Sequence, residues 1–248
     1  MAIIIIFICL AIQKYLQFYS LSFNYCWVSW YQKIIVGWFS AKLSSTPILN
    51  FLLLTVVPAL FIAIIFTVIY HVFDALGYWI LSAVLLWYCL DFKDPEASED
   101  GGCNIDSDIV SYFHKVFVII FWFFIGSWWL AFYMVARDVE AYGDKANDAR
   151  ACFVINRKLL ALLDWIPARV LGLSLALTSS FSCVFPKWVV DLKKSYQDTS
   201  NCLVSWFEAV IPKDGEAGAT LSKLTSLLRY SLILWLIVML ALSVAGVL

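Results

Sequence analysis

The chain has 248 residues, of which 63% are hydrophobic and 17% are aromatic. Only 14% are charged, against about 25% in a typical soluble domain, which excludes a soluble globular enzyme and a disordered chain. Seventeen Lys and Arg against eighteen Asp and Glu give a net charge of -1, so there is no basic excess that would hold nucleic acid. The composition predicts an integral membrane protein.

Three long uncharged stretches predict membrane-spanning helices, namely residues 51–70, 116–136 and 230–248. A spanning helix needs about 20 apolar residues to cross roughly 30 Å of hydrocarbon. The Leu, Ile, Val and Phe side chains of residues 51–70 favour insertion by on the order of 4–8 kcal/mol. Pro58 is tolerable inside that stretch because neighbouring helices can satisfy the carbonyl that it frees.

Two shorter apolar stretches complete the set of expected crossings. Residues 75–90 follow the first long stretch after only four residues, so the two predict a tight helical hairpin. Residues 1–19 are a candidate further crossing, with Lys14 reaching the membrane surface through its long side chain. No Lys or Arg precedes this stretch and no small-residue cleavage site follows it, so we expect no removable signal peptide.

One apolar segment, residues 159–185, contains the charged side chains Asp164 and Arg169. The apolar side chains from residue 170 onwards favour insertion by about 2–5 kcal/mol, whereas one central arginine costs about 2.5–3.5 kcal/mol. The sum is close to zero. Hydropathy therefore leaves open whether residues 167–185 cross the membrane, dip into it or lie on its surface.

The distribution of charge predicts the orientation of the chain. If residues 159–185 do not cross, residues 137–227 form one loop with eleven Lys or Arg, whereas residues 91–115 hold seven acids and two basic residues. The positive-inside rule then places the loop after Arg137 in the cytoplasm. If the segment does cross, residues 186–227 move outside and the C-terminus moves in.

Residues 23–39 form a separate element in which aromatic and aliphatic side chains recur at helical spacing. Such a pattern predicts an amphipathic helix lying in the membrane interface, or a helix packed beneath the bundle. The whole chain, residues 1–248, is thus expected to be one all-α domain. Its predicted architecture is a polytopic transmembrane helical bundle with four or five crossings and an interfacial amphipathic helix.

The sequence lacks the common signatures of metal, nucleotide and hydrolase sites. Its seven Cys are scattered, without a C-x-x-C pair, so neither a disulfide framework nor a zinc site is expected. The phosphate-binding, G-x-S-x-G and H-E-x-x-H motifs are absent. We therefore expect no metal, no cofactor and no catalytic residue, and we interpret His71 and His114 as interfacial polar residues.

The clearest local signal is the run Asp164-Trp165-Ile166-Pro167-Ala168-Arg169. Asp164 can cap a helix that follows it, and Pro167 fits a first helical turn, where its missing N–H costs little. Arg169, about one turn further on, is close enough in sequence to pair with Asp164. The run predicts either a helix start at the membrane surface or a polar pair at a membrane-embedded site, where ionisable residues are functional candidates.

A second polar stretch follows the crossing expected at residues 116–136. Charges of both signs are mixed from Arg137 to Lys158, which is typical of a solvated cytoplasmic helix with ion pairs between successive turns. The alternative is a ligand site formed together with the Asp164 run. The candidate ligand-binding residues are Arg137, Asp138, Asp164 and Arg169.

Two segments resemble a known family. The run LLDWIPARVLGLSLALTSSF (residues 162–181) resembles the L-D-W-[IV]-P-x-R-L-x-[AG] segment of the AmpE family, with Val170 where the family has Leu. Residues 112–142 are similar to the F-W-x-x-x-G stretch upstream of it. The resemblance implies a multi-pass protein of the bacterial inner membrane, without catalytic activity, connected with cell-wall stress and β-lactamase induction.

AmpE proteins look related to the CbiB/CobD membrane proteins of cobalamin synthesis, which implies a second function class. Such a protein would join an aminopropanol group to a corrinoid and would use ATP. Here residues 186–203 lack the His of the corresponding CbiB stretch, and Gln13-Lys14 stands where family members often carry an acid-base pair. Both departures argue against retained ligase chemistry.

A third function class is a structural subunit of a membrane complex. Twelve Trp and nineteen Phe give an apolar exterior that suits packing on other helices, although contact with lipid explains it as well. The expected partners are the lipid bilayer and other membrane proteins, and not nucleic acid. For the regulatory function, a ligand would have to bias a segment with two arrangements. The Asp164 run and the charged stretch before it are the candidates.

Overall fold

The computed structural model describes residues 47–90, 105–145, 151–210 and 217–245, together with Ile6, Tyr31 and Ile34. Within these ranges the secondary structure consists of helices and turns, without a strand. The predicted all-α fold class is confirmed. Most of the crossing expected at residues 1–19 and of the amphipathic helix expected at residues 23–39 lies outside the described residues.

Four helical stretches are long and apolar enough to cross a membrane. They are Ile48–Asp74, Asp106–Ile125, Cys152–Thr178 and Lys223–Val244, and Leu76–Cys89 is a shorter apolar helix. Only 22% of the most apolar part of Ile48–Asp74 is buried inside the protein. Large apolar side chains such as Phe61 and Ile64 therefore face outwards, as they do in helices surrounded by lipid. The chain folds as a polytopic membrane protein.

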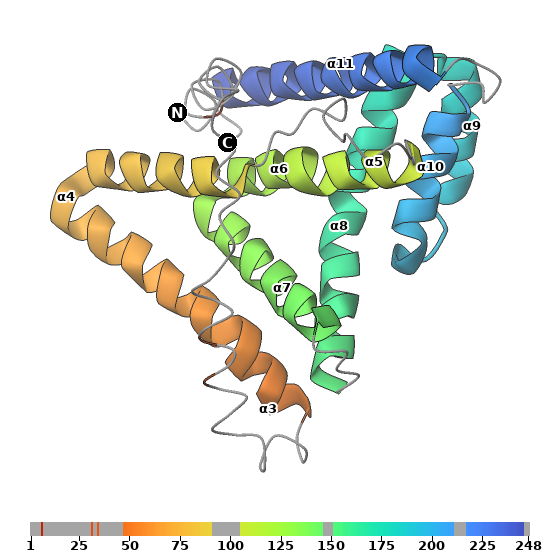
Figure 1. Ribbon diagram of the computed structural model, residues 1–248. Coiled ribbons are helices and arrows are strands. Elements are labelled where there is room, and N and C mark those ends of the chain that lie inside the picture. Colours follow the sequence, from red (N-terminus) through yellow and green to blue (C-terminus); the bar gives the residue numbers. More distant parts are fainter. Residues whose placement is uncertain are drawn as a thin grey trace.

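The first described helix folds back on itself. It begins as α3 (Pro47–Phe51), passes through the π turn η1 (Leu52–Val56) and continues as α4 (Val57–Cys89). At Asp74 the backbone leaves the helical region (φ 53, ψ -157), and Figure 1 shows α4 bent sharply into two arms. The expected hairpin is present, with a kink at one residue in place of a four-residue turn.

The stretch from 105 to 145 is divided at Gly126. The elements α5 (Ile105–Tyr112), the π turn η3 (Phe113–Phe117) and α6 (Val118–Ile125) follow one another along one axis, and α7 (Ser127–Lys145) departs in a new direction (Figure 1). Gly126 itself is extended (φ 165, ψ 143). The prediction of a single helix over residues 116–136 is therefore wrong, because glycine is a poor helix former and a hydrogen bond from Ser127 to Ser82 at 2.8 Å fixes the break against α4.

The Asp164 run lies inside a long helix, α8 (Ala151–Thr178). The prediction that Asp164 and Pro167 begin a helix is therefore wrong. Pro167 cannot donate to the carbonyl of Leu163, one turn earlier, but such a loss is tolerated where neighbouring helices pack around the chain. The segment 159–185 thus enters a candidate span as far as Thr178 and then turns at Ser179 and Ser180.

The remaining elements pack beside α8. They are α9 (Phe181–Asp191), the short 3-10 helix η4 (Tyr196–Asp198), α10 (Thr199–Glu208) and α11 (Ala217–Val244). Figure 1 shows α9 and α10 side by side next to α8, while α11 crosses the end of α8 that lies away from α7.

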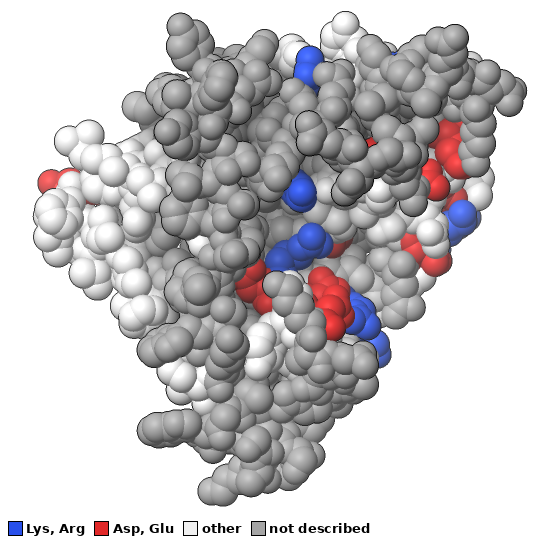
Figure 2. All heavy atoms as spheres, viewed as in Figure 1, with Lys and Arg blue, Asp and Glu red and all other residues white. Residues whose placement is uncertain are grey.

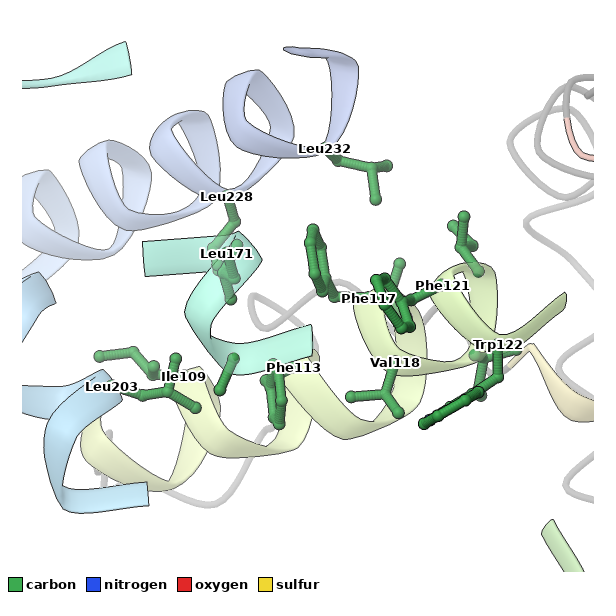
Figure 3. Close-up of a cluster of buried hydrophobic side chains, with 14 of the residues drawn as sticks. Ile109, Phe113, Phe117, Val118, Phe121, Trp122, Leu171, Leu203, Leu228 and Leu232 are labelled. Carbon is green, nitrogen blue, oxygen red and sulfur yellow. The ribbon is translucent and has the colours of Figure 1, made fainter. Parts of the chain in front are cut away.

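The main core lies where the α5–α6 unit meets α8, α10 and α11. A stripe of side chains at four-residue intervals, beginning with Ile109 and Phe113, faces inwards from α5–α6 and is almost completely buried. Figure 3 shows these side chains pointing towards Leu171 of α8, Leu203 of α10 and Leu228 of α11. The core holds α10 against α8, and thereby positions the polar residues described next.

Candidate functional site

Three polar side chains from three helical elements meet in the interior. The Tyr133 hydroxyl of α7 donates a hydrogen bond to Oδ1 of Asp164 on α8 at 2.8 Å. Nδ1 of His114, in the π turn η3, lies 3.6 Å from Oδ2 of the same carboxylate and 3.5 Å from the Tyr133 hydroxyl. Only 7% of Asp164 is exposed, so its carboxylate is held by partners and is not solvated like a surface acid.

The local helix geometry places these groups on shared faces. On α7, Tyr133, Arg137 and Glu140 follow one another at intervals of four and three residues, which puts them on one side of a helix. On α8 the same spacing relates Arg157, Leu160 or Ala161, and Asp164. Because α7 and α8 pack together, the two faces enclose a polar space.

That space is a pocket with a volume of about 160 Å³. Its deep end is formed by His114 and Asp164, and its mouth by charged side chains of α7 and α8. The lining residues are His114, Arg137, Glu140, Arg157, Leu160, Ala161, Asp164, Tyr196, Thr199 and Ser200. Figure 2 shows basic and acidic atoms gathered in one patch over α7 and α8, in the middle of this face.

Ion pairs organise the mouth of the pocket. The Arg157 guanidinium contacts Oδ1 of Asp144 at 2.6 Å and Oε1 of Glu140 at 3.5 Å. Burial raises the pKa of the Glu140 carboxyl above its ordinary value of 4.5, and the carboxylates of Asp144 and Asp164 also raise it, while the guanidinium groups of Arg137 and Arg157 oppose the shift. Glu140 therefore takes up a proton at a higher pH than an exposed glutamate does.

The structure brings together two of the four predicted ligand-binding residues, Arg137 and Asp164. Arg169 does not pair with Asp164, so the expected polar pair is wrong. Five residues along a helix correspond to a rotation of about 500°, or 140° beyond a full turn, so the two side chains project in different directions. Asp138, one position after Arg137 on α7, is half-buried and is not among the residues that line the pocket.

Arg169 lies between two aromatic rings. Its guanidinium carbon is 5.4 Å from the ring centroids of both Trp165 and Trp206, and the residue is 7% exposed. None of its three side-chain nitrogens has a hydrogen-bond partner among the described residues, so its charge is stabilised by the faces of the two rings. Trp188 of α9 donates to the Arg169 carbonyl at 2.9 Å. The contacts of Arg169 with Trp188 of α9 and Trp206 of α10 therefore hold these two helices against α8.

A second polar contact fixes the mutual position of α7, α8 and η1. The Asn156 side chain, fully buried on α8, donates to the carbonyl of Ala136 at 2.8 Å and accepts from the Thr55 hydroxyl at 3.2 Å. It satisfies groups on two other elements close to the pocket wall. Asn156 therefore holds together the elements that form the site, but it does not line the pocket.

Several residues in and beside the pocket were missed by reasoning from the sequence. His114 was interpreted as an interfacial residue, but it faces Asp164. Tyr133 was counted within an apolar stretch, although its spacing to Arg137 was a signal that could have been used. No sequence pattern pointed to the pocket residues of η4 and α10, which are Tyr196, Thr199 and Ser200. Only the packing of elements that are distant in sequence brings these residues to the pocket.

Within the described part of the chain, no group of three or more His, Cys, Asp or Glu side chains is arranged to hold a metal ion. The polar groups that line the site are guanidinium, carboxylate, imidazole and hydroxyl groups, which suit a small polar organic ligand. Comparison with known proteins adds no identity: no family model, no curated protein and no solved structure matches this chain.

Proposed function

We propose that this chain is an AmpE-like regulatory protein of the bacterial inner membrane, connected with cell-wall stress and β-lactamase induction. In this proposal the pocket between α7, α8 and α10 is the site at which a small ligand acts. The protein carries out no reaction of its own. Its ligand changes how α7 and α8 pack, and a membrane partner responds to that change.

One observation carries this proposal: the two stretches with the family resemblance both contribute side chains to the pocket. Residues 112–142 supply His114, Arg137 and Glu140, and residues 162–181 supply Asp164. The Tyr133–Asp164 hydrogen bond joins the two stretches directly. Ionisable groups in the membrane-embedded part of a protein are energetically costly and commonly mark functional sites, and here several of them line one pocket.

An induction assay tests the proposal. The host is a bacterium with an inducible chromosomal β-lactamase and without its own AmpE family member, exposed to a sub-inhibitory β-lactam. We expect wild-type chain to change β-lactamase activity relative to an empty vector. The variants Asp164→Asn and Glu140→Gln should lose that effect at equal membrane abundance. Lys187→Gln, an exposed change on α9, should keep it.

Two results would contradict the regulatory function. One is equal induction with wild-type chain and with empty vector, and the other is full induction by both pocket variants. Isothermal titration of the purified protein with ATP and with a corrinoid separates the ligase alternative, which requires both to bind. Co-purification in a mild detergent of a fixed set of membrane proteins, unaffected by the pocket variants, would favour the structural-subunit alternative.

A further inference from the structure

The size of the pocket limits its ligand. A cavity of about 150 Å³ accommodates a molecule the size of benzene, and this pocket has a volume of about 160 Å³. A molecule enclosed by it therefore has about the size of a small amino acid. Larger molecules could place only one end group inside.

The pocket contains groups that are suited to a carboxylate. The guanidinium groups of Arg137 and Arg157 line it, and such groups bind carboxylates through paired, charge-assisted hydrogen bonds. The first turn of α10 lines it as well, through Thr199 and Ser200. The N–H groups of a helix's first turn have no partner within the helix and favour an anion. The arginines and the helix end reinforce each other.

The pocket also contains groups that are suited to an ammonium group, and one of them, Glu140, lies 3.5 Å from Arg157. Glu140 and Asp164 both line the pocket, and within the described residues the partners of Asp164 are the neutral Tyr133 hydroxyl and the titratable His114 ring. Among the lining residues the two carboxylates balance the two guanidinium groups when His114 is neutral, and the Asp144 carboxylate that pairs with Arg157 at 2.6 Å lies outside the lining. A ligand with a net charge would upset this balance, whereas a zwitterion preserves it.

The apolar part of the lining is small. It consists of Leu160 and Ala161, which lie between the charged groups on α8. A methyl group or a similarly short aliphatic side chain would fill the space beside them. A long or charged ligand side chain would not.

We propose that the pocket binds a small α-amino acid in its zwitterionic form, with its carboxylate at Arg137, Arg157 and the first turn of α10 and its ammonium group at Glu140 and Asp164. This inference rests on the proposed function in one respect, namely that this pocket is the ligand site. The same ammonium-carboxylate chemistry occurs in a free amino acid and in the head group of phosphatidylserine. The experiment therefore includes both sources.

The test uses the full chain in nanodiscs of phosphatidylcholine and measures equilibrium binding of radiolabelled alanine. We expect saturable binding, and competition by unlabelled alanine but not by acetate or ethylamine, which each carry half of its charges. Glu140→Gln and Arg157→Gln should each weaken binding about tenfold or more, as loss of one charge-assisted contact implies. Arg157 is largely exposed, so its variant is expected to fold. Lys187→Gln is the matched control and should bind as wild type does.

Phosphatidylserine in the nanodiscs distinguishes the two sources. If it abolishes alanine binding and the Arg157→Gln variant resists this effect, the head group is the ligand and the chemical class stands. Absence of saturable binding in both kinds of nanodisc, or equal competition by acetate and alanine, would overturn the inference.

The two proposals can fail separately. Alanine binding that depends on Glu140, together with induction that ignores the Glu140→Gln variant, would contradict the regulatory function and uphold the ligand class. Induction that requires Glu140, without binding of alanine or of phosphatidylserine, would uphold the regulatory function and overturn the ligand class.

Discussion

The Tyr133 hydroxyl donates to the Asp164 carboxylate at 2.8 Å, and this bond joins α7 to α8 at the deep end of the pocket. Tyr133 is 1% exposed and Asp164 is 7% exposed, so the bond between them is largely shielded from bulk water. A hydrogen bond to a buried charged group stabilises a fold more than a neutral surface bond does. The same bond also fixes the direction in which the carboxylate faces the pocket.

Tyr133→Phe removes this donor and leaves the ring in place. We expect the free energy of unfolding to fall by about 1–3 kcal/mol, because the buried carboxylate loses a charge-assisted partner. Unfolding by SDS in mixed micelles measures the change. Tyr142→Phe, on the same helix and half-buried, is the control and should have little effect. Equal stability of Tyr133→Phe and the wild type would contradict the assigned bond.

Asn156→Ala should also destabilise the protein. The change leaves the Thr55 hydroxyl and the Ala136 carbonyl without the partner that now joins three elements. Hydrogen bonds between membrane helices contribute about 0.6 kcal/mol on average and at most about 1.7, so we expect a loss of roughly 1–2 kcal/mol for the pair. Lys158→Ala, exposed on the same helix, should unfold like the wild type. If the two variants are indistinguishable, the Asn156 contacts do not hold α7 and η1.

Gly172→Ala tests the packing around Arg169. A Cβ atom at Gly172 would lie 2.5 Å from the Trp206 ring and 2.7 Å from the half-buried Trp188 ring. The Trp206 ring is fully buried and donates a hydrogen bond to Asp191 at 2.8 Å, which holds it in place. Overpacking of this kind costs about 1–3 kcal/mol. We expect that loss in the same unfolding assay, with increased exposure of α9 and α10 to proteolysis. Leu173→Met, at an exposed site next in the chain, should change neither quantity.

The raised pKa of Glu140 predicts a dependence on pH. Burial, the first cause of the shift, makes the folded protein hold this proton more tightly than the unfolded chain does. Stability should therefore fall as the pH rises from 4.5, the ordinary pKa of the carboxyl, through the raised value in the folded state. In Glu140→Gln this part of the pH profile should be absent, and an unchanged profile would show that Glu140 is not its source.

Alanine binding should have the opposite dependence on pH, because the ammonium group needs the ionised Glu140. We expect affinity to decline as the pH is lowered from neutrality, beginning above the range in which an exposed glutamate titrates. Other charged or titratable groups line the pocket or act on Glu140 from η3, α7, α8 and η4: His114, Arg137, Asp144, Arg157, Asp164 and Tyr196. The decline should therefore be compared between the wild type and Glu140→Gln, and affinity that is constant over this range in the wild type would contradict the assigned contact.

The sequence predicted those features of the fold that depend on local composition. Length and hydropathy were enough to find the first and the last of the long apolar helices, Ile48–Asp74 and Lys223–Val244, since insertion depends on the sum of side-chain contributions. The sum of side-chain contributions carries no information on where the helix axis changes direction. It therefore gave one helix over residues 116–136, where Gly126 divides α6 from α7.

The candidate site was predictable only in part. Arg137 and Asp164 were identified because charged groups beside apolar stretches are uncommon, but the partner chosen for Asp164 was wrong. Proximity in sequence suggested Arg169, whereas the actual partners, Tyr133 and His114, are 31 and 50 residues away. Such contacts arise from helix packing, which the pattern of a single segment does not encode.

Both proposed functions require that the chain is embedded in a bilayer, and extraction of membranes tests this most directly. Membranes from cells that express the full chain are washed with alkaline carbonate, which removes peripheral proteins, and are then treated with a non-ionic detergent. We predict that the chain stays in the membrane pellet through the carbonate wash and enters the supernatant only with detergent. Release by carbonate alone would contradict the account.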